Sequence, residues 1–242
     1  MKLKTHMLAT DLDNTLAGND SDVRDLITLF QNAPYDVALV YVTGRHAESV
    51  RQLISEASLP IPDLVISDVG TKVWHMPDWQ EDLLWSKQMG KGWQPERVLE
   101  TASGFPGLHR QKLPEDCRIS FTLEDGIDTV NEFKDALCAK HIPHHLVFSS
   151  NNDVDVLPRG SGKGNALEYV IQQFAHPSVN LLVAGDSGND TDMLSRGWPS
   201  VIVGNAYEEL KGIPDHPNLY RASRHYAGGI YEAWQHFYGA SN

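Results

Sequence analysis

The chain has little cysteine, little positive charge and no long hydrophobic run. It holds two cysteines, and 20 Lys plus Arg stand against 32 Asp plus Glu, giving a formal net charge of −12. The two cysteines lack zinc-ligand spacing, and no secretory signal opens the chain, so we expect reduced thiols and a cytoplasmic protein. The negative charge argues against binding nucleic acid or an anionic membrane. No apolar run approaches the roughly 18 residues of a transmembrane helix.

Short apolar segments alternate with segments of helical length. The expected strands lie at residues 8–10, 37–42, 64–67, 181–184 and 201–203, and the expected helices lie at 22–32, 46–57, 165–174 and 190–195. Continuous apolar runs of this length are typical of strands buried on both faces of a parallel sheet. The alternation predicts an α/β fold with a doubly wound, Rossmann-like parallel sheet.

The middle of the chain follows a different pattern. Residues 118–123, 145–148 and 153–157 alternate polar with apolar side chains, which indicates strands with one buried face. Residues 129–140 form a plausible amphipathic helix between the first two of these strands. We therefore expect a smaller α+β domain at residues 80–157, inserted into a core made of residues 1–79 and 158–242.

Two carboxylates follow the first expected strand. Asp11 and Asp13 lie two residues apart where the strand ends. Such a pair suits metal binding, nucleophilic attack or proton transfer. A purely structural turn with a helix cap is the competing interpretation, but it needs only one of the two acids.

Further polar motifs follow the second expected strand and precede the helix at 165–174. Thr43, Gly44 and Arg45 combine a hydroxyl with backbone N–H groups at the start of a helix, which can hold phosphate. Lys163 lies in a glycine-rich loop before the next helix and can bring one positive charge to a phosphate. The loop is not a nucleotide-binding P-loop, because Gly164 stands where that motif needs Ser or Thr.

The last motif is Gly-Asp-Ser-Gly-Asn-Asp at residues 185–190, directly after another apolar strand. It adds Asp186 and Asp190 to the same expected edge of the sheet, together with Asn189. A structural turn rarely needs two acids, two glycines and an amide. Each of these motifs alone has a plain structural explanation, but their common position at strand ends indicates one site.

In this order, the four motifs resemble those of the haloacid-dehalogenase superfamily of aspartate-nucleophile phosphatases. The insertion between Thr43 and Lys163 is similar to the α+β cap of one of its subfamilies. Residues 10–15, 149–166, 185–190 and 223–230 most resemble the sucrose-phosphate phosphatases. The resemblance implies a phosphoric monoester hydrolase that acts on a sugar phosphate, sucrose 6-phosphate above all.

The resemblance also implies roles for individual residues. Asp11 would be the nucleophile, and Asp13 would protonate the leaving sugar oxygen and then activate water. Thr43 and Lys163 would hold phosphate oxygens, with Gly44, Arg45 and Asn189 as further contacts. Mg²⁺ would be held by Asp11, Asp186 and the backbone carbonyl of Asp13, with Asp190 fixing the metal shell and Lys163.

Charge counting agrees with the metal that the resemblance implies. Three aspartates and a phosphate monoester would face a single lysine at this edge. Each like-charge pair near 4 Å costs about 4 kcal/mol at an effective dielectric constant of about 20. Oxygen ligands without nearby Cys or His favour Mg²⁺ over zinc.

The inserted domain offers polar side chains that we expect to contact the sugar. Alternation places Arg118 and Ser120 on the face opposite Ile119, and it separates Asp153 and Asp155 from the valines between them. A polar sheet face that meets only water is the alternative.

Other functions stay open at this point. A receiver domain, with Asp68 as its phosphorylated residue, would need a much shorter chain. A phosphomutase, a non-catalytic sugar-phosphate binding subunit, or a phosphatase for mannosylfructose phosphate, trehalose phosphate or a hexose phosphate remain alternatives. We expect a monomer that binds a small-molecule sugar phosphate, with a sugar-phosphate synthase as its protein partner.

Overall fold

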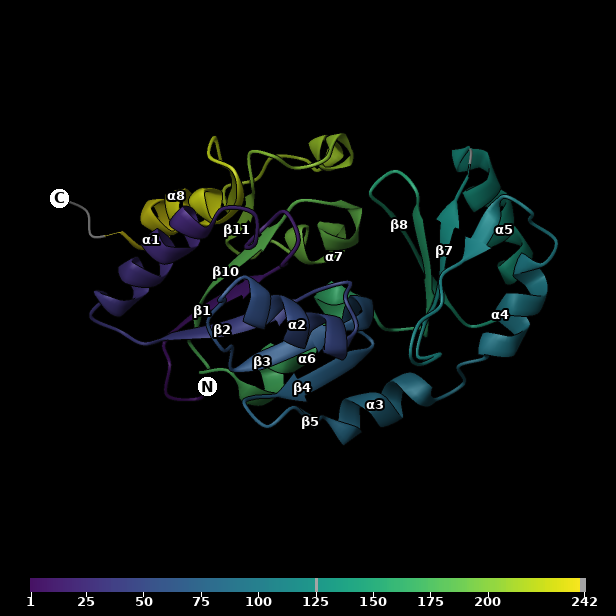
Figure 1. Cartoon of the computed structure of the whole chain (residues 1–242), viewed down its shortest axis with the longest axis horizontal. Coiled ribbons are helices and arrows are strands. Elements are labelled where there is room, and N and C mark those ends of the chain that lie inside the picture. Colours follow the sequence, from purple (N-terminus) through teal and green to yellow (C-terminus); the bar gives the residue numbers. More distant parts are fainter. Residues whose placement is uncertain (125, 240–242) are drawn as a thin grey trace.

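The computed structural model of the chain describes residues 1–124 and 126–239. A core built on an eight-stranded sheet lies beside a smaller cap built on a four-stranded sheet (Figure 1). The core strands are β1 (His6–Thr10), β2 (Val37–Val42), β3 (Leu64–Ser67), β4 (Lys72–His75), β5 (Gln80–Glu81), β10 (Asn180–Gly185), β11 (Ser200–Ile202) and β12 (Leu219–Arg221). The core helices are α1 (Asp20–Gln31), α2 (Ala47–Glu56), α3 (Leu83–Gly90), α6 (Lys163–Phe174), α7 (Thr191–Leu194) and α8 (Tyr226–Tyr238).

The order of the core strands explains where a ligand can bind. The sheet runs β12-β11-β10-β1-β2-β3-β4-β5, and its strands from β12 to β3 are parallel. The chain moves outward from β1 in one direction and from β10 in the other. The strand order therefore reverses between β1 and β10, and open α/β sheets bind ligands at the carboxyl ends of such strands. The predicted doubly wound α/β core is confirmed.

Both faces of the core sheet are covered. Met7 and Ala9 of β1 pack in the cluster that includes side chains of α3, α6 and α7. Leu8, between them, packs on the opposite face with α1, α2 and α8. Burial on both sides explains why the core strands are continuous apolar runs. None of the described helices is long and apolar enough to cross a membrane.

Several core elements were not predicted. The sheet continues through the antiparallel pair β4 and β5, ends at β12, and is flanked by α8. Two adjacent glycines in the first turn of α8 disfavour a helix by propensity. Packing requires a glycine there, because a Cβ on Gly229 would lie 2.7 Å from the backbone oxygen of Arg224.

The start of the cap also differs from the sequence-based expectation at residue 80. β5 pairs with β4 in the core sheet, and Trp85 and Met89 of α3 are buried in a core cluster. The hydrophobic cluster of the cap begins at Val98. We therefore propose that the division between core and cap lies after α3.

The cap is an antiparallel sheet covered by helices on its outer side (Figure 1). Its elements are α4 (Pro95–Ala102), β6 (Leu108–Arg110), β7 (Ile119–Leu123), α5 (Ile127–Ala139), β8 (His145–Ser149) and β9 (Asp153–Leu157), with strand order β6-β7-β9-β8. Ile119, Phe121 and Val154 pack beneath the helices, as the alternation predicts. The polar sides of β7 and β9 therefore point away from the helices.

The centre of the cap depends on Phe133 of α5. Phe133 is fully buried and makes edge contacts with the rings of Phe105 and Phe121. We expect Phe133→Ala to lower the free energy of unfolding of the cap by about 3–5 kcal/mol, because it leaves a cavity. Urea unfolding followed by tryptophan fluorescence measures this. The exposed neighbour Lys134 provides the control, Lys134→Ala, and a loss below about 1 kcal/mol for Phe133→Ala would contradict the assignment.

Candidate active site

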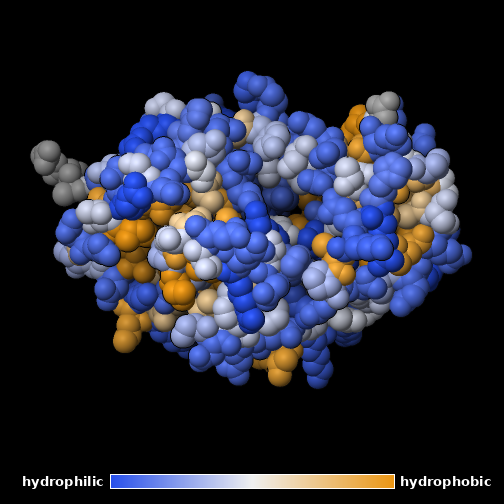
Figure 2. All heavy atoms as spheres, in the orientation of Figure 1, coloured by the Kyte–Doolittle hydropathy of each residue, from blue (hydrophilic) through white to orange (hydrophobic). Residues whose placement is uncertain are grey.

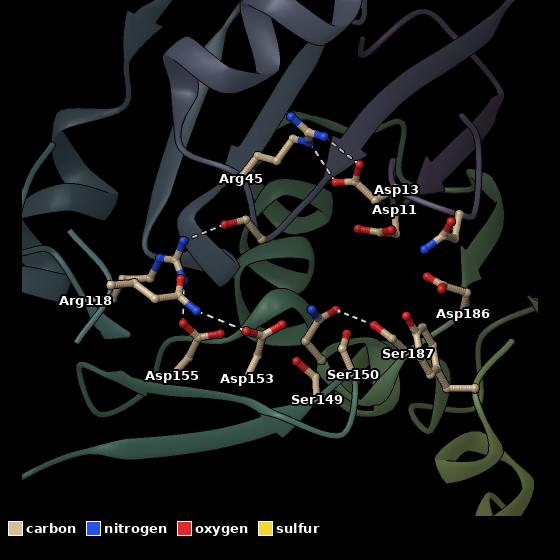
Figure 3. Close-up of a pocket in the computed structure, with 15 residues that line it drawn as sticks. Asp11, Asp13, Arg45, Arg118, Ser149, Ser150, Asp153, Asp155, Asp186 and Ser187 are labelled. Atoms are coloured by element: carbon tan, nitrogen blue, oxygen red, sulfur yellow. Dashed lines mark hydrogen bonds and ion pairs between the residues drawn. The ribbon is translucent and has the colours of Figure 1, made fainter. Parts of the chain in front are cut away.

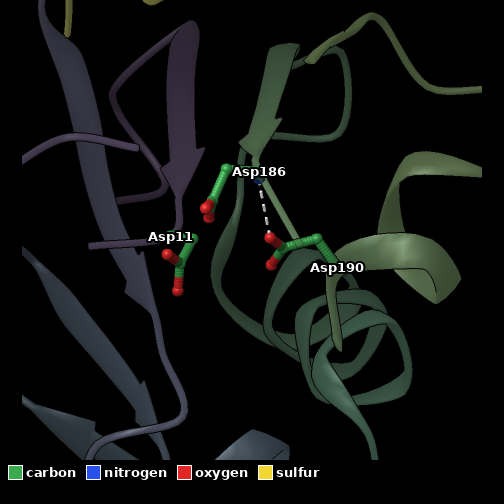
Figure 4. A group of neighbouring side chains, drawn as sticks. All are labelled: Asp11, Asp186 and Asp190. Carbon is green, nitrogen blue, oxygen red and sulfur yellow. Dashed lines mark hydrogen bonds between the residues drawn. The ribbon is translucent and has the colours of Figure 1, made fainter. Parts of the chain in front are cut away.

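The carboxylates predicted from the sequence meet where the strand order reverses. Thr10 at the end of β1 pairs with Ala184 of β10, so the residues that follow these strands are neighbours. Asp11 donates its backbone N–H to the oxygen of Ala184 at 3.0 Å. Carboxylate oxygens of Asp11, Asp186 and Asp190 all lie within 4.8 Å of one another (Figure 4).

Lys163 holds two of these aspartates together. It begins α6 and is buried, and its Nζ donates to Oδ1 of Asp11 and to Oδ1 of Asp190, both at 2.7 Å. The second oxygen of Asp190 accepts the backbone N–H of Asp186 at 2.9 Å and of Ser187 at 3.1 Å. Both Asp190 oxygens therefore have donors, and Asp190 orients the lysine and the Asp186 loop.

Burial and like charge disturb the ionisation of this cluster. Burial raises the pKa of Asp11 to about 7, although Lys163 opposes the shift. Burial, followed by the charges of Asp190 and Asp11, raises the pKa of Asp186 to about 8. Burial works to lower the pKa of Lys163, but the two aspartates together raise it above its usual value. Three aspartates therefore share the single positive charge of Lys163 in this cluster.

This donor set fits a hard divalent cation. Oxygens of Asp11 and Asp186 face each other, and Thr15 orients Asp186 by donating its hydroxyl to Oδ1 at 3.0 Å. Neither sulfur nor imidazole belongs to the cluster, and carboxylate oxygens are the usual ligands of Mg²⁺. A divalent cation here would offset the negative excess that raises both pKa values.

Asp13 lines the same cavity as Asp11 and pairs with Arg45. The Nε and Nη2 atoms of Arg45 donate to the two oxygens of Asp13 at 2.7 and 2.8 Å. Nη1 of Arg45 donates to Ser49 at 2.7 Å, which fixes the guanidinium on α2. The bidentate pair keeps the half-buried Asp13 carboxylate beside the cavity.

A cavity of about 260 Å³ opens in front of these groups, between core and cap. Figure 2 shows the hollow with mostly hydrophilic residues around it, and Figure 3 shows its lining side chains. The lining residues are Asp11, Asp13, Asn14, Gly44, Arg45, Asp186, Ser187, Asn189 and Tyr207 from the core, and Gln111, Arg118, Ser149, Ser150, Asp153 and Asp155 from the cap.

Most of the residues singled out in the sequence reach this cavity, but four of them do not line it: Thr43, Ser120, Lys163 and Asp190. Thr43 and Lys163 are buried beneath the described lining residues, and the Thr43 hydroxyl accepts the backbone N–H of Arg45 at 3.1 Å. Ser120, expected to contact the sugar, is also buried. Its hydroxyl bonds to Arg118 at 2.7 Å and to Asp155, so it supports those two side chains from behind.

The sequence analysis missed several lining residues. Ser187 lies inside a recognised motif but was not singled out. Gln111 follows β6, a strand of three residues with no clear pattern, and it donates to Asp153 at 3.0 Å. Tyr207 lies in a loop after β11, far in sequence from every motif of the cap. No local signal marks Gln111 or Tyr207.

The cap contacts the core on two sides of the cavity. Nη2 of Arg118 donates to the backbone oxygen of Gly44 at 2.7 Å. Glu209, in a short 3₁₀ helix of the core (Glu208–Gly212), accepts the backbone N–H of Ser150 at 3.2 Å and that of Gly188. These contacts hold the polar face of the cap over Asp11.

Comparison with known proteins agrees with this architecture. The chain matches the family model described as sucrose-6F-phosphate phosphohydrolase over residues 4–238. It is 32% identical to a probable sucrose-phosphatase 1 of Arabidopsis thaliana over 96% of this chain, but spans only 59% of that protein. It is 29% identical to a mannosylfructose-phosphate phosphatase of Agrobacterium fabrum over 96% of both chains.

A solved structure is similar across core and cap together. The sucrose-phosphatase of Synechocystis sp. PCC6803, in complex with sucrose and phosphate, superimposes with a TM-score of 0.91. The two chains are 33% identical, and the match covers 98% of this chain and 100% of the other. From its sequence match, its fold and its four motifs, the chain belongs to the sucrose-6F-phosphate phosphohydrolase family of the haloacid-dehalogenase superfamily.

Proposed function

We propose that the chain is a phosphatase that hydrolyses a sugar phosphate, with sucrose 6-phosphate as its preferred substrate. The observation that carries the proposal is the position of Asp11. Its carboxylate lies between Lys163 and Asp186 and lines a cavity whose opposite wall is the polar face of the cap. The plant and cyanobacterial relatives named as sucrose-phosphatases support the choice of sugar.

The reaction would proceed in two steps on Asp11. The Asp11 carboxylate attacks phosphorus, the bond to the sugar oxygen breaks, and Asp13, acting in its protonated form, gives that oxygen its proton. Asp13 then takes a proton from a water molecule, which attacks the aspartyl phosphate and releases inorganic phosphate. Two moderate barriers replace one high barrier, and the acid and base roles of Asp13 alternate.

Mg²⁺ is the cofactor that we propose for the acidic cluster. Asp11, Asp186 and the backbone carbonyl of Asp13 would hold it, and Asp190 would keep Asp186 and Lys163 in place. When bound, the ion supplies positive charge that offsets the aspartates and the phosphate. Lys163 and Thr43 would bind phosphate oxygens, with Gly44, Arg45 and Asn189 as further contacts.

The cap would recognise the sugar. Arg118, Asp153, Asp155 and Gln111 present donors and acceptors to the cavity, and a polyol needs such pairs because unpaired buried polar groups are costly. With the cap over the site, bulk water is kept from the phosphoryl group during transfer.

A phosphatase for mannosylfructose phosphate is the second candidate, because the Agrobacterium relative of that name matches nearly the whole chain. Phosphate release from a panel of sucrose 6-phosphate, mannosylfructose phosphate, trehalose phosphate and hexose phosphates separates the candidates. Detecting an isomerised sugar phosphate would reveal a phosphomutase, and binding without turnover would reveal a binding subunit. The synthase partner, the monomeric state and the cytoplasmic location stay predictions.

Replacing the nucleophile tests the covalent step. Asp11→Asn keeps the size of the side chain but removes its negative charge, so we expect turnover to fall by several orders of magnitude. Asp20→Asn, at an exposed carboxylate in the first turn of α1, is the matched control and should keep wild-type turnover. Phosphate release measures both. Wild-type turnover in Asp11→Asn would refute the role of Asp11.

Calorimetry of Mg²⁺ binding tests the metal site without relying on activity. The pKa values of about 7 for Asp11 and about 8 for Asp186 mean that protons compete with the ion at low pH. We expect the affinity of chelator-treated protein to rise from pH 6 to pH 9 as both acids lose their protons. Asp186→Asn should weaken binding by at least about tenfold. Affinity that does not change with pH would contradict this site.

Removing the cap arginine tests sugar recognition. A hydrogen bond to a charged group contributes about 1.5–3 kcal/mol, so Arg118→Ala should raise the KM for the disaccharide phosphate by about 10- to 100-fold. Hydrolysis of p-nitrophenyl phosphate, which lacks a sugar, should change far less. Arg110→Ala, which removes an exposed cap arginine, is the control. Equal losses on both substrates would indicate damage to the fold instead of lost recognition.

A further inference from the structure

Asp68 is a buried carboxylate that the proposed reaction does not use. It follows β3 at the edge of the core that faces the cap, and it is 5% exposed. The backbone is left-handed at Asp68 and Val69, with φ of 53° and 54°. This conformation is strained for a β-branched residue such as Val69, and strain of this kind persists only where the surroundings enforce it.

The surroundings of this turn leave it little freedom. Gly70 also has a positive φ, of 87°, and a Cβ there would lie 2.3 Å from the backbone oxygen of Gly162. The backbone N–H of Asp68 donates to the oxygen of Arg45 at 2.8 Å. The turn is therefore packed against both the glycine-rich loop before α6 and the loop that holds Gly44.

The carboxylate of Asp68 is oriented by hydrogen bonds from the core. Its Oδ2 accepts the hydroxyl of Ser67 at 2.8 Å, and that hydroxyl oxygen accepts the indole N–H of Trp74 at 2.9 Å. The other oxygen, Oδ1, lies 3.6 Å from Nε of Arg118. Burial raises the pKa of Asp68, and the positive charge of Arg118 opposes that shift.

Arg118 makes contacts within the cap and also with the core. Within the cap, its Nη1 donates to Ser120 at 2.7 Å and to Asp155. On the core, Nη2 donates to the backbone oxygen of Gly44 at 2.7 Å, and Nε has no hydrogen bond to any described residue. Asp68 is therefore the charge that the core presents to the unpaired edge of this guanidinium.

We infer that Asp68 is a positioning residue that sets Arg118 for sugar recognition when the cap lies on the core. This inference rests on the proposed function. Asp155 accompanies Arg118 in any position of the cap, whereas Asp68 and Gly44 meet it only across the cap–core boundary. The full set of contacts around the guanidinium thus forms only when the cap lies on the core, so Arg118 is oriented for the sugar when it also contacts the backbone of Gly44.

The physical reason lies in the burial of the arginine. A buried guanidinium needs its donors and charge satisfied, and removing one partner of such a pair leaves the other uncompensated. Without Asp68, Arg118 would keep Asp155 and Ser120 but would lose the negative charge that faces Nε. Its orientation toward the cavity would then be less restricted, which weakens binding of the sugar without touching the reacting atoms.

Kinetics on two substrates tests this inference. Asp68→Ala should lower kcat/KM for the disaccharide phosphate about tenfold relative to kcat/KM for p-nitrophenyl phosphate, mainly through KM. Asp68→Asn should lose less, because its amide oxygen keeps a partial negative charge facing Nε. In the Arg118→Ala background, Asp68→Ala should change the ratio no further, since Asp68 acts through Arg118. Asp116→Asn, at the exposed partner of Arg110, should leave the ratio unchanged.

Hydrogen exchange in the absence of substrate supplies a readout that does not depend on turnover. Asp68→Ala and Asp68→Asn should increase amide exchange in peptides covering residues 43–45 and 117–120, whereas Asp116→Asn should not. If the wild type hydrolyses no sugar phosphate, the proposed function fails, and exchange alone decides the role of Asp68.

Two results would overturn the inference while the proposed function stands. One is an active wild type whose substrate ratio stays within about twofold in both Asp68 variants. The other is an effect of Asp68→Ala that remains undiminished in the Arg118→Ala background, which would show that Asp68 does not act through Arg118. Asp68→Asn keeps the test valid if Asp68→Ala does not fold.

Discussion

The rest of the site depends on the pairing of the buried Lys163 ammonium with two aspartates. At 2.7 Å from both Asp11 and Asp190, the ammonium joins the end of β1, the loop after β10 and the start of α6. A fully buried charge is stable only with such partners, and removing one partner of a buried pair costs about 3–5 kcal/mol. Because Asp190 also accepts the backbone N–H groups of Asp186 and Ser187, the lysine indirectly sets the position of the Asp186 carboxylate.

Charge balance connects this cluster with the cap. The cavity is rich in aspartates, and its two arginines, Arg45 and Arg118, are already paired with Asp13 and Asp155. An incoming phosphate therefore finds little uncommitted positive charge among the described lining residues. This is the physical reason for proposing a divalent cation at the site, and for proposing that the cap recognises the sugar through polar contacts and does not neutralise the phosphate.

The position of the core motifs followed from topology more than from any single residue. Parallel strands end at the same edge, so Asp11, Thr43 and Asp186 had to lie near one another once the doubly wound sheet was predicted. The alternation in β7 and β9 likewise assigned Phe121 and Val154 to the interior of the cap. These predictions succeeded because the periodicity of a strand is a local property.

The sequence by itself determined the α/β core, the inserted cap and the acidic motifs at the strand ends, since each has a local pattern. Only the tertiary structure decided that Ser120 supports Arg118 from behind, that Gln111 and Tyr207 line the cavity, and that Asp68 faces the cap. These are relations between segments far apart in the chain, across a boundary between two domains. Alternation assigns a side chain to one face of its sheet, but the packing of cap against core decides what that face meets.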